Sequence, residues 1–151
     1  TWKIDKGRLV AEKIHNAALW LKKSLPDHVR VEFDARAETA DGDVKCEIFG
    51  DGQTHQSGYI LIHGGWRNTT NCIARLDEHG EDRKNDNRCG ARGGARRCVE
   101  PEVDYRWAVE RTDGTVRWYL EGKLFLTYPD KHPLPGRFFA FNNWLYLVHC
   151  V

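Results

Sequence analysis

The stretch YRWAVERTDGTVRWYLEG, residues 105–122, decides the fold. It contains two runs of alternating large apolar and polar residues, which meet at a turn centred on Asp113 and Gly114. Asp-Gly supplies the positive φ angles that a tight hairpin turn requires. In such a hairpin Val116 and Trp118 point to one face of the sheet, and the polar residues between them point to the other. The stretch therefore predicts a β-hairpin with one apolar face.

The same alternation recurs along most of the chain, and turn-forming residues separate the alternating segments at short intervals. We expect strands at residues 8–14, 18–23, 28–38, 43–49, 57–63, 71–77, 105–111, 115–121, 123–128, 137–141 and 145–150. Residues 11–23 also fit an amphipathic helix, but the alternation around Trp20 and the nearby Pro26 favour a strand. The pattern predicts an all-β chain, folded as an antiparallel two-sheet β-sandwich of jelly-roll type, with residues 1–151 in a single domain.

The predicted strand at residues 28–38 has two contrasting faces. Its apolar face consists of Val29, Val31, Phe33, Ala35 and Ala37, and its charged face consists of Arg30, Glu32, Asp34 and Arg36. The apolar face is expected to lie against the core. The charged face is either a floor for ligand binding or a solvated outer surface with cross-strand ion pairs, and the second interpretation is favoured.

The chain has 151 residues and a formal net charge of +1, so no overall field attracts it to nucleic acid or to an anionic membrane. No apolar run approaches the length that crosses a bilayer, and the amino end lacks the segments of a signal peptide. We therefore expect no nucleic acid partner and no transmembrane segment. Methionine is absent throughout, so we expect Thr1 to be a processed end or a domain boundary, with an upstream signal peptide still open.

Five cysteines in a chain of this length favour an oxidising compartment, so we expect a secreted, periplasmic or cell-surface protein. Cys89 and Cys98 bracket the segment CGARGGARRC, and we expect a disulfide between them to hold its backbone. Cys46 alternates with apolar residues on a predicted strand and is expected to face the core. Any two of Cys46, Cys72 and Cys150 can still pair, and at least one of them is expected to be a buried apolar residue.

Six further blocks extend the pattern over nearly the whole chain: WKIDKGRLV, VEFDARA, GDVKCEIFGDG, SGYILIHGGWRN, IARLDEHGEDR and FAFNNW. Together with the hairpin they resemble the concanavalin A-like lectin and glucanase superfamily, which includes laminin G-like domains. Within it they are similar to a branch of uncharacterised secreted or lipid-anchored bacterial proteins. The resemblance implies a jelly roll that can carry a saccharide on one sheet. The segment 89–98 departs from that pattern, and residues 145–151 must supply the last strand or leave a sheet edge open to a partner.

Glycosidases of this superfamily place acids in a pattern resembling E-x-D-x-x-E, and the nearest segment, LDEHGE at residues 76–81, does not match it. If a strand continued through the segment, the carboxylates of Asp77 and Glu81 would lie about 13 Å apart. A retaining pair of carboxylates requires about 5 Å. The alternative is a turn stabilised by hydrogen bonds and by pairing with Arg75 or Arg83. We therefore assign no catalytic residue, and glycoside hydrolysis ranks third among the functions considered.

Calcium is the other chemistry that the loops suggest. Asp41, Asp43 and Asp51 lie in two glycine-containing loops on either side of a predicted strand, and carboxylates with backbone carbonyls suit a hard cation. Aspartate in such loops more often stabilises turns. We expect no bound cofactor or metal, with calcium as the alternative.

Two tryptophans give the better argument for a site, because Trp66 follows Gly-Gly and Trp144 follows Asn-Asn where predicted strands end. Indole faces stack on sugar rings, and neighbouring amide and guanidinium groups donate hydrogen bonds to hydroxyls. The candidate saccharide contacts are Trp66, Arg67, Asn68, Asn142, Asn143 and Trp144. The alternative, equally weighted, is that both indoles close the ends of the sandwich while the asparagines cap turns.

A basic loop at residues 82–97 carries Arg83, Lys84, Arg88, Arg92, Arg96 and Arg97. Such a loop suits an anionic polysaccharide or an acidic protein subunit, and the lack of interleaved aromatics disfavours single-stranded nucleic acid. We expect a carbohydrate-binding, lectin-like module without catalysis, whose partner is a polysaccharide or other glycan. The alternative is an accessory subunit of a larger extracellular or membrane-associated assembly, docked through the basic loop and the open edge.

Overall fold

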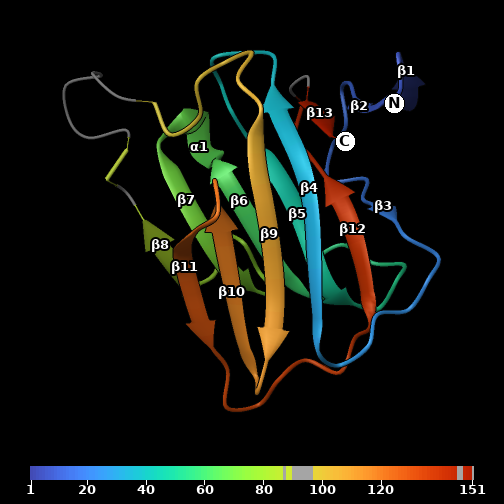
Figure 1. Ribbon diagram of the computed structural model, residues 1–151, viewed down its shortest axis with the longest axis vertical. Coiled ribbons are helices and arrows are strands. Elements are labelled where there is room, and N and C mark those ends of the chain that lie inside the picture. The colour runs from blue at the N-terminus through green and yellow to red at the C-terminus, as the bar shows by residue number, and fades with distance from the viewer. Residues whose placement is uncertain (87, 90–96, 146–147, 151) are drawn as a thin grey trace.

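Two antiparallel β-sheets pack face to face in the computed structural model, which describes residues 1–86, 88–89, 97–145 and 148–150 (Figure 1). The spatial order of the seven-stranded sheet is β1 (Trp2–Asp5), β2 (Arg8–Ala11), β13 (Val148–Cys150), β4 (Val29–Ala37), β9 (Tyr105–Thr112), β10 (Thr115–Leu120) and β11 (Lys123–Pro129). The order of the six-stranded sheet is β3 (Leu19–Trp20), β12 (Phe138–Asn142), β5 (Val44–Gly50), β6 (Tyr59–Gly64), β7 (Thr70–Arg75) and β8 (Arg83–Asp86). The predicted all-β jelly roll is confirmed.

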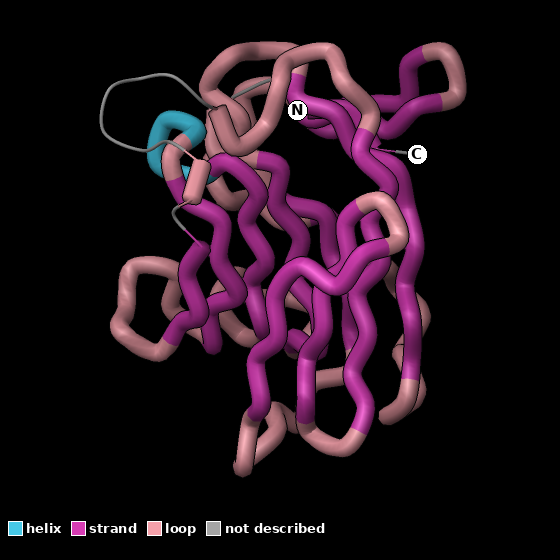
Figure 2. The backbone as a smooth tube through the Cα atoms, turned by 60° about the vertical axis from the view of Figure 1, so that its left-hand side comes forward, coloured by secondary structure: helices cyan, strands magenta, loops and turns pink. Residues whose placement is uncertain are grey.

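The short segment α1 (Gly65–Asn68) joins β6 to β7 at the upper end of the six-stranded sheet (Figure 2). In the part of the chain that the structure describes, no helix is long and apolar enough to cross a bilayer.

The hairpin that decides the fold forms as predicted between β9 and β10. Asp113 and Gly114 have φ angles of 50° and 72°, and Thr112 pairs with Thr115 across the turn. Trp118 is fully buried, and its ring centroid lies 4.4 Å from that of Trp107 on β9. The hairpin therefore contributes two indoles, in contact with each other, to the core between the sheets.

The two faces of β4 also behave as the alternation predicts. Its apolar side chains pack into the core, and Phe33 stacks on Trp107 with ring centroids 5.3 Å apart. On the outer face Arg30 pairs with Glu110 of β9 at 3.1 Å, and Arg106 of β9 pairs with Asp34 at 2.5 Å. The charged face is thus an outer surface with cross-strand ion pairs, as the favoured interpretation stated.

The structure corrects the sequence-based assignment of four segments. Residues 83–86, assigned to the basic loop, form the edge strand β8, whose sequence RKND is polar throughout and gives no alternation. Residues 2–5 form the unexpected edge strand β1, and residues 8–14 and 18–23 contribute only the short strands β2 and β3.

The end of the chain supplies the missing strand. β13 pairs with β2 on one side and with β4 on the other, so it lies inside the seven-stranded sheet. Docking through an open edge at this place therefore loses its structural basis.

The cysteines form the one expected disulfide, and the other three are free thiols. Cys89 and Cys98 are linked. Cys46 and Cys150 lie in the main core, whereas Cys72 is buried on the opposite face of the six-stranded sheet, with Ile60, Ile62 and Ala74. Each of the three is a buried free thiol, so none of them pairs with another.

Candidate functional site

A cavity of about 330 Å³ opens at the end of the six-stranded sheet where β5 begins and β6 ends. Its lining comes from two strands, the segment α1 and four loops: Asn16, Asp43, Lys45, Ile62, Trp66, Arg67, Glu78, His79 and Trp144. Every residue of β5 and β6 is buried, so this sheet is covered on both faces at its centre. The cavity therefore lies between the outer face of the sheet and the loops that cover it.

The floor of the cavity is a network of buried charges. The ammonium of Lys45, on β5, lies 2.8 Å from Oε2 of Glu78 and 4.0 Å from Oδ2 of Asp43. Asn16 joins the network on both sides, since its Oδ1 accepts a bond from Lys45 Nζ at 3.0 Å and its Nδ2 donates to Glu78 Oε1 at 3.2 Å. Buried charges are tolerated when they are paired in this way.

The two carboxyl groups of the floor respond differently to the same surroundings. Burial raises the pKa of Asp43, and the opposing effects of Lys45 and of the Trp144 N–H, which donates to Asp43 Oδ2 at 2.8 Å, do not cancel it. Burial also acts to raise the pKa of Glu78, but the close Lys45 ammonium outweighs it, so the pKa of Glu78 is lowered. The cavity thus holds a firmly ionised carboxylate beside one that protonates more easily.

Two half-exposed indoles stand at the cavity above the charged floor. Trp66 is 37% exposed and Trp144 is 44% exposed. Both are therefore large apolar side chains in contact with solvent. The guanidinium carbon of Arg83 lies 4.9 Å from the Trp66 ring, and His15 packs on Trp144 with centroids 5.1 Å apart. Each indole is therefore held by a neighbouring ring or cation.

The backbone around the cavity is strained. Four of its lining residues are not glycine yet have positive φ angles: Asn16 at 52°, Asp43 at 62°, Trp66 at 50° and Arg67 at 59°. A left-handed conformation costs Trp66 and Arg67 about 1–2 kcal/mol each, whereas asparagine and aspartate tolerate it better. Conformations of this kind collect at functional sites, where the surrounding structure holds them in place.

The six predicted saccharide contacts separate into two groups. Trp66, Arg67 and Trp144 line the cavity together. Asn68, Asn142 and Asn143 are buried and bond within the protein instead.

Each of these asparagines supports a neighbouring segment. Asn68 Nδ2 donates to the carbonyl oxygens of Ala40 and Val99, and Asn143 Nδ2 donates to the carbonyl oxygen of Asp43 at 2.9 Å. Asn142 Nδ2 lies 3.0 Å from His55 Nδ1.

The segment LDEHGE forms the turn that the alternative interpretation describes. β7 ends at Arg75, the Asp77 carboxylate accepts the His79 N–H at 2.9 Å, and Arg83 donates to the Glu78 carbonyl at 2.6 Å. Arg75 pairs with Asp130 rather than with this turn. The turn carries the Glu78 side chain into the cavity, a role that its sequence did not indicate.

Sequence reasoning also missed Asn16, Lys45, Ile62 and His79. Lys45 did carry a usable signal, because a lysine between Val44 and Cys46 on a buried strand requires a partner. Its partner comes from a loop more than thirty residues away in the chain, which alternation does not reveal.

The aspartates considered for calcium have separate roles. Asp43 belongs to the cavity floor, and the Asp51 carboxylate accepts the N–H groups of Gln53 and Thr54 in a turn. Among the described residues, no group of three or more His, Cys, Asp and Glu side chains is arranged to hold a metal ion.

Those of the basic residues that the structure describes contact different partners. Arg83 packs on Trp66, Arg88 pairs with Asp86 at 2.7 Å, and Arg97 lies 3.9 Å from Glu100. Lys84 is exposed on β8, and Arg92 and Arg96 lie outside the described residues.

The sequence matches no family model, and it matches no curated protein. Among solved structures, the carbohydrate-binding module CBM66 from Bacillus subtilis superposes with a TM-score of 0.73 at 12% identity, covering 99% of this chain and 87% of that one. The chain has a concanavalin A-like fold. Two further structures share it at lower similarity.

Sheep galectin-11 in complex with glycerol has a TM-score of 0.59 at 10% identity, covering 91% of this chain and 98% of that one. The β-glucanase of Bacillus licheniformis has a TM-score of 0.60 at 14% identity, covering 99% of this chain and 78% of that one. The predicted concanavalin A-like architecture is thereby confirmed, while identities this low concern the fold alone.

Proposed function

We propose that this chain is an extracellular carbohydrate-binding domain, and that a saccharide binds in the cavity between Trp66 and Trp144. The observation that carries the proposal is the combination of two half-exposed indoles with a buried, hydrogen-bonded charged floor in one cavity. Proteins rarely leave large aromatic faces beside polar groups without a binding role.

The chemistry of the cavity matches that of a sugar. The apolar face of a sugar ring packs on an indole, while its hydroxyls donate to the carboxylates of Asp43 and Glu78 and accept from Arg67. A volume of about 330 Å³ lies at the lower end of the range for small-molecule sites, which suits one or two sugar units rather than a long chain segment.

Two further observations support the proposal. A carbohydrate-binding module and a galectin are among the structures that share the fold. The Cys89–Cys98 disulfide suits a protein that works outside the reducing cytosol.

The test is a glycan array followed by calorimetric titration of the best ligand. Trp66→Ala and Trp144→Ala should each weaken binding by about 1 to 3 kcal/mol, or roughly 5- to 150-fold in Kd, because each removes an aromatic anchor. Tyr119→Ala is the matched control, since Tyr119 is a surface aromatic on β10 that also lies against an arginine, remote from the cavity. The glycan affinity of the Tyr119→Ala variant should equal that of the wild type. Failure of the array to find any ligand, or normal binding by both tryptophan variants, would contradict the proposal.

Glycoside hydrolysis is a second candidate because the pKa values of Asp43 and Glu78 move in opposite directions within one cavity. Asp43 Oδ2 and Glu78 Oε2 lie no more than about 7 Å apart, since both contact the same Lys45 ammonium. Glycosidase carboxylates are separated by about 5 to 9.5 Å. Turnover of the bound glycan by wild type, abolished in Glu78→Gln with binding retained, would favour this candidate. Binding without any product favours the first.

A further inference from the structure

The turn that carries Trp66 and Arg67 lies next to the disulfide. From Gly64 to Asn68 the turn contains four residues in the left-handed region, with φ angles of 71° at Gly64, 50° at Trp66, 59° at Arg67 and 63° at Asn68. Three of them are not glycine, so the conformation is unfavourable in isolation. Contacts from other segments must therefore hold the turn in place.

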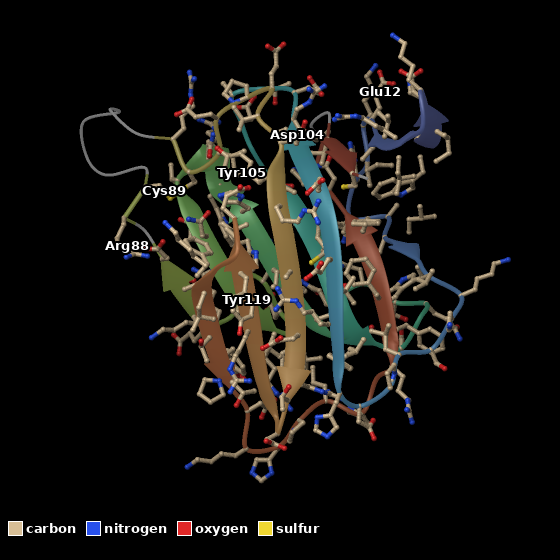
Figure 3. The ribbon with its side chains drawn as sticks, in the orientation of Figure 1. Glu12, Arg88, Cys89, Asp104, Tyr105 and Tyr119 are labelled. Carbon is tan, nitrogen blue, oxygen red and sulfur yellow. A yellow bond between two sulfur atoms is a disulfide. The ribbon has the colours of Figure 1, made fainter. Side chains whose placement is uncertain are left out.

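Cys89 is connected to the start of this turn through Asn71. The buried Asn71 side chain donates from Nδ2 to Cys89 Sγ at 3.0 Å and accepts the Gly64 N–H on Oδ1, also at 3.0 Å. Cys89 lies next to Arg88 just beyond β8, on the same side of the molecule as α1 (Figures 1 and 3). One half of the disulfide is thus one side chain away from Gly64.

Cys98 is connected to the end of the same turn. Its N–H donates to the Asn68 carbonyl at 3.4 Å. The next residue, Val99, donates its N–H to Asn68 Oδ1 at 2.8 Å and accepts from Asn68 Nδ2 at 2.6 Å. Val99 also packs on Gly64, since a Cβ placed there would come within 2.8 Å of Val99 Cγ2.

We propose that the Cys89–Cys98 disulfide is a clamp that fixes both ends of the turn, and that its reduction weakens saccharide binding in the cavity. Trp66 and Arg67 contact the ligand, whereas Asn68, Asn71 and the two cysteines are positioning residues. The inference rests on the proposed function for its ligand. The other indole has a less direct link to the turn: the Trp144 N–H donates to Asp43, whose own N–H donates to the Gly64 carbonyl at 2.8 Å, and the Trp144 ring also packs on His15.

Dithiothreitol is the reductant of the Cys89–Cys98 disulfide in these experiments. The S–S bond breaks, and each sulfur takes up one electron and one proton to become a thiol. The reductant loses the two electrons and two protons and closes to its cyclic disulfide. The remaining cysteines are free thiols before and after this reaction.

The first experiment measures the affinity of the best glycan for oxidised, reduced and reoxidised protein. We expect reduction to raise Kd about tenfold and reoxidation to restore it, because the site keeps one positioned indole and loses the orientation of the other. A Cys89→Ser/Cys98→Ser variant should bind as weakly as the reduced protein and should not respond to dithiothreitol.

A single substitution tests the contacts of the clamp without breaking the disulfide. Asn71→Ala removes the bonds to Gly64 and Cys89 while the disulfide stays intact, and it should weaken binding to a similar degree. Asn85→Ala on the neighbouring strand β8 is the control, because Asn85 is exposed and lies at the sheet edge. It should leave binding unchanged.

The second readout needs no ligand. The indole N–H resonances of Trp66 and Trp144, assigned with Trp66→Phe and Trp144→Phe, should respond differently to reduction. We expect the Trp66 signal to shift clearly more than the Trp144 signal. A shift at Trp66 in a protein that binds no glycan would uphold the clamp and contradict the proposed function.

Three results would overturn the clamp. If reduction changes neither the glycan affinity nor the Trp66 resonance, the clamp is excluded. Equal shifts at both indoles would show that the disulfide acts on the whole fold. Normal binding by Asn71→Ala would remove the connection to Gly64 on which the mechanism depends.

Discussion

Replacing Lys45 by methionine tests the charged floor, because it removes the ammonium and nearly preserves the volume of the side chain. The side chains of Lys45 and Glu78 are only 2% and 5% exposed and lie 2.8 Å apart. Removing one partner of a buried ion pair costs about 3–5 kcal/mol. Glu78 keeps its bond from Asn16 and can take up a proton, so we expect the lower limit, about 3 kcal/mol at pH 7. In a domain of this size that corresponds to a fall in Tm of about 6–12 °C.

The destabilisation caused by Lys45→Met should become smaller as the pH falls. Lys45 holds the pKa of Glu78 below its ordinary value of 4.5, so the stability from the pair is present above that value and is lost as the pH falls through the lowered pKa. In Lys45→Met the largest of the effects that lower the pKa of Glu78 is gone, so we expect burial to outweigh the remaining bond from Asn16 and to raise this pKa. The variant should therefore come closer to wild type in unfolding free energy between pH 7 and about pH 4, where its Glu78 becomes protonated.

Urea denaturation at several pH values measures these differences, and the sequence offers a matched control. Lys3→Met breaks the pair with Glu12, whose side chains are 50% and 48% exposed, and should cost less than about 0.5 kcal/mol. Adding Glu78→Gln to Lys45→Met should recover about 1 kcal/mol or more, because no uncompensated charge remains. The reasoning is refuted if Lys45→Met costs no more than Lys3→Met, or costs the same at every pH.

Three other predictions concern the fold. Gly114→Ala should destabilise the protein by about 1–2 kcal/mol more than Gly122→Ala, by thermal unfolding, because both have positive φ angles but only a Cβ at Gly114 meets a backbone oxygen, that of Asp130, at 2.7 Å. Burial raises the pKa of the Cys72 and Cys150 thiols to about 12, so iodoacetamide at pH 8 should label them in guanidinium and not in native protein; native labelling would contradict their burial. Burial lowers the pKa of His63 to about 4, so its imidazole resonances should not titrate between pH 8 and about pH 5.5.

The sequence is informative wherever a strand has one wet face. The segment VRVEFDARA of β4 alternates along its whole length, and the observed burial follows the same alternation toward its carboxyl end. The hairpin of β9 and β10 adds a turn whose chemistry permits one geometry. These elements were predictable because local pattern and tertiary environment agree.

The sequence did not predict the edge strands, and it did not show that the central strands are buried on both faces. Edge strand β8 is polar throughout, so its backbone pairing leaves no trace in the apolar pattern, and edge strand β1 is only four residues long, too short for its alternation to stand out. Strand β5 was located correctly and Cys46 faces the core as expected, but Lys45 and Glu47, on the other face of the strand, are buried as well. Loops cover that face, and alternation within a strand contains no information about what covers it.

The cavity depends on such long-range cover. Its two indoles were accessible to sequence reasoning because tryptophan next to Gly-Gly or Asn-Asn is unusual. The charged floor could not be predicted in this way, because Asn16, Lys45 and Glu78 come from segments far apart in the chain and make contact only in the folded protein.

The positive φ angles at Trp66 and Arg67 explain why the site needs this cover. Neither residue type favours a left-handed conformation, so the turn exists because Asn68, Val99 and other buried partners compensate its cost. That compensation is in place without a ligand, and the floor is likewise already paired by Lys45. A saccharide that enters the proposed site therefore meets indoles and carboxylates that are already oriented. Little of the binding free energy of the proposed ligand is then lost to ordering the protein, and this favours binding even in a cavity this small.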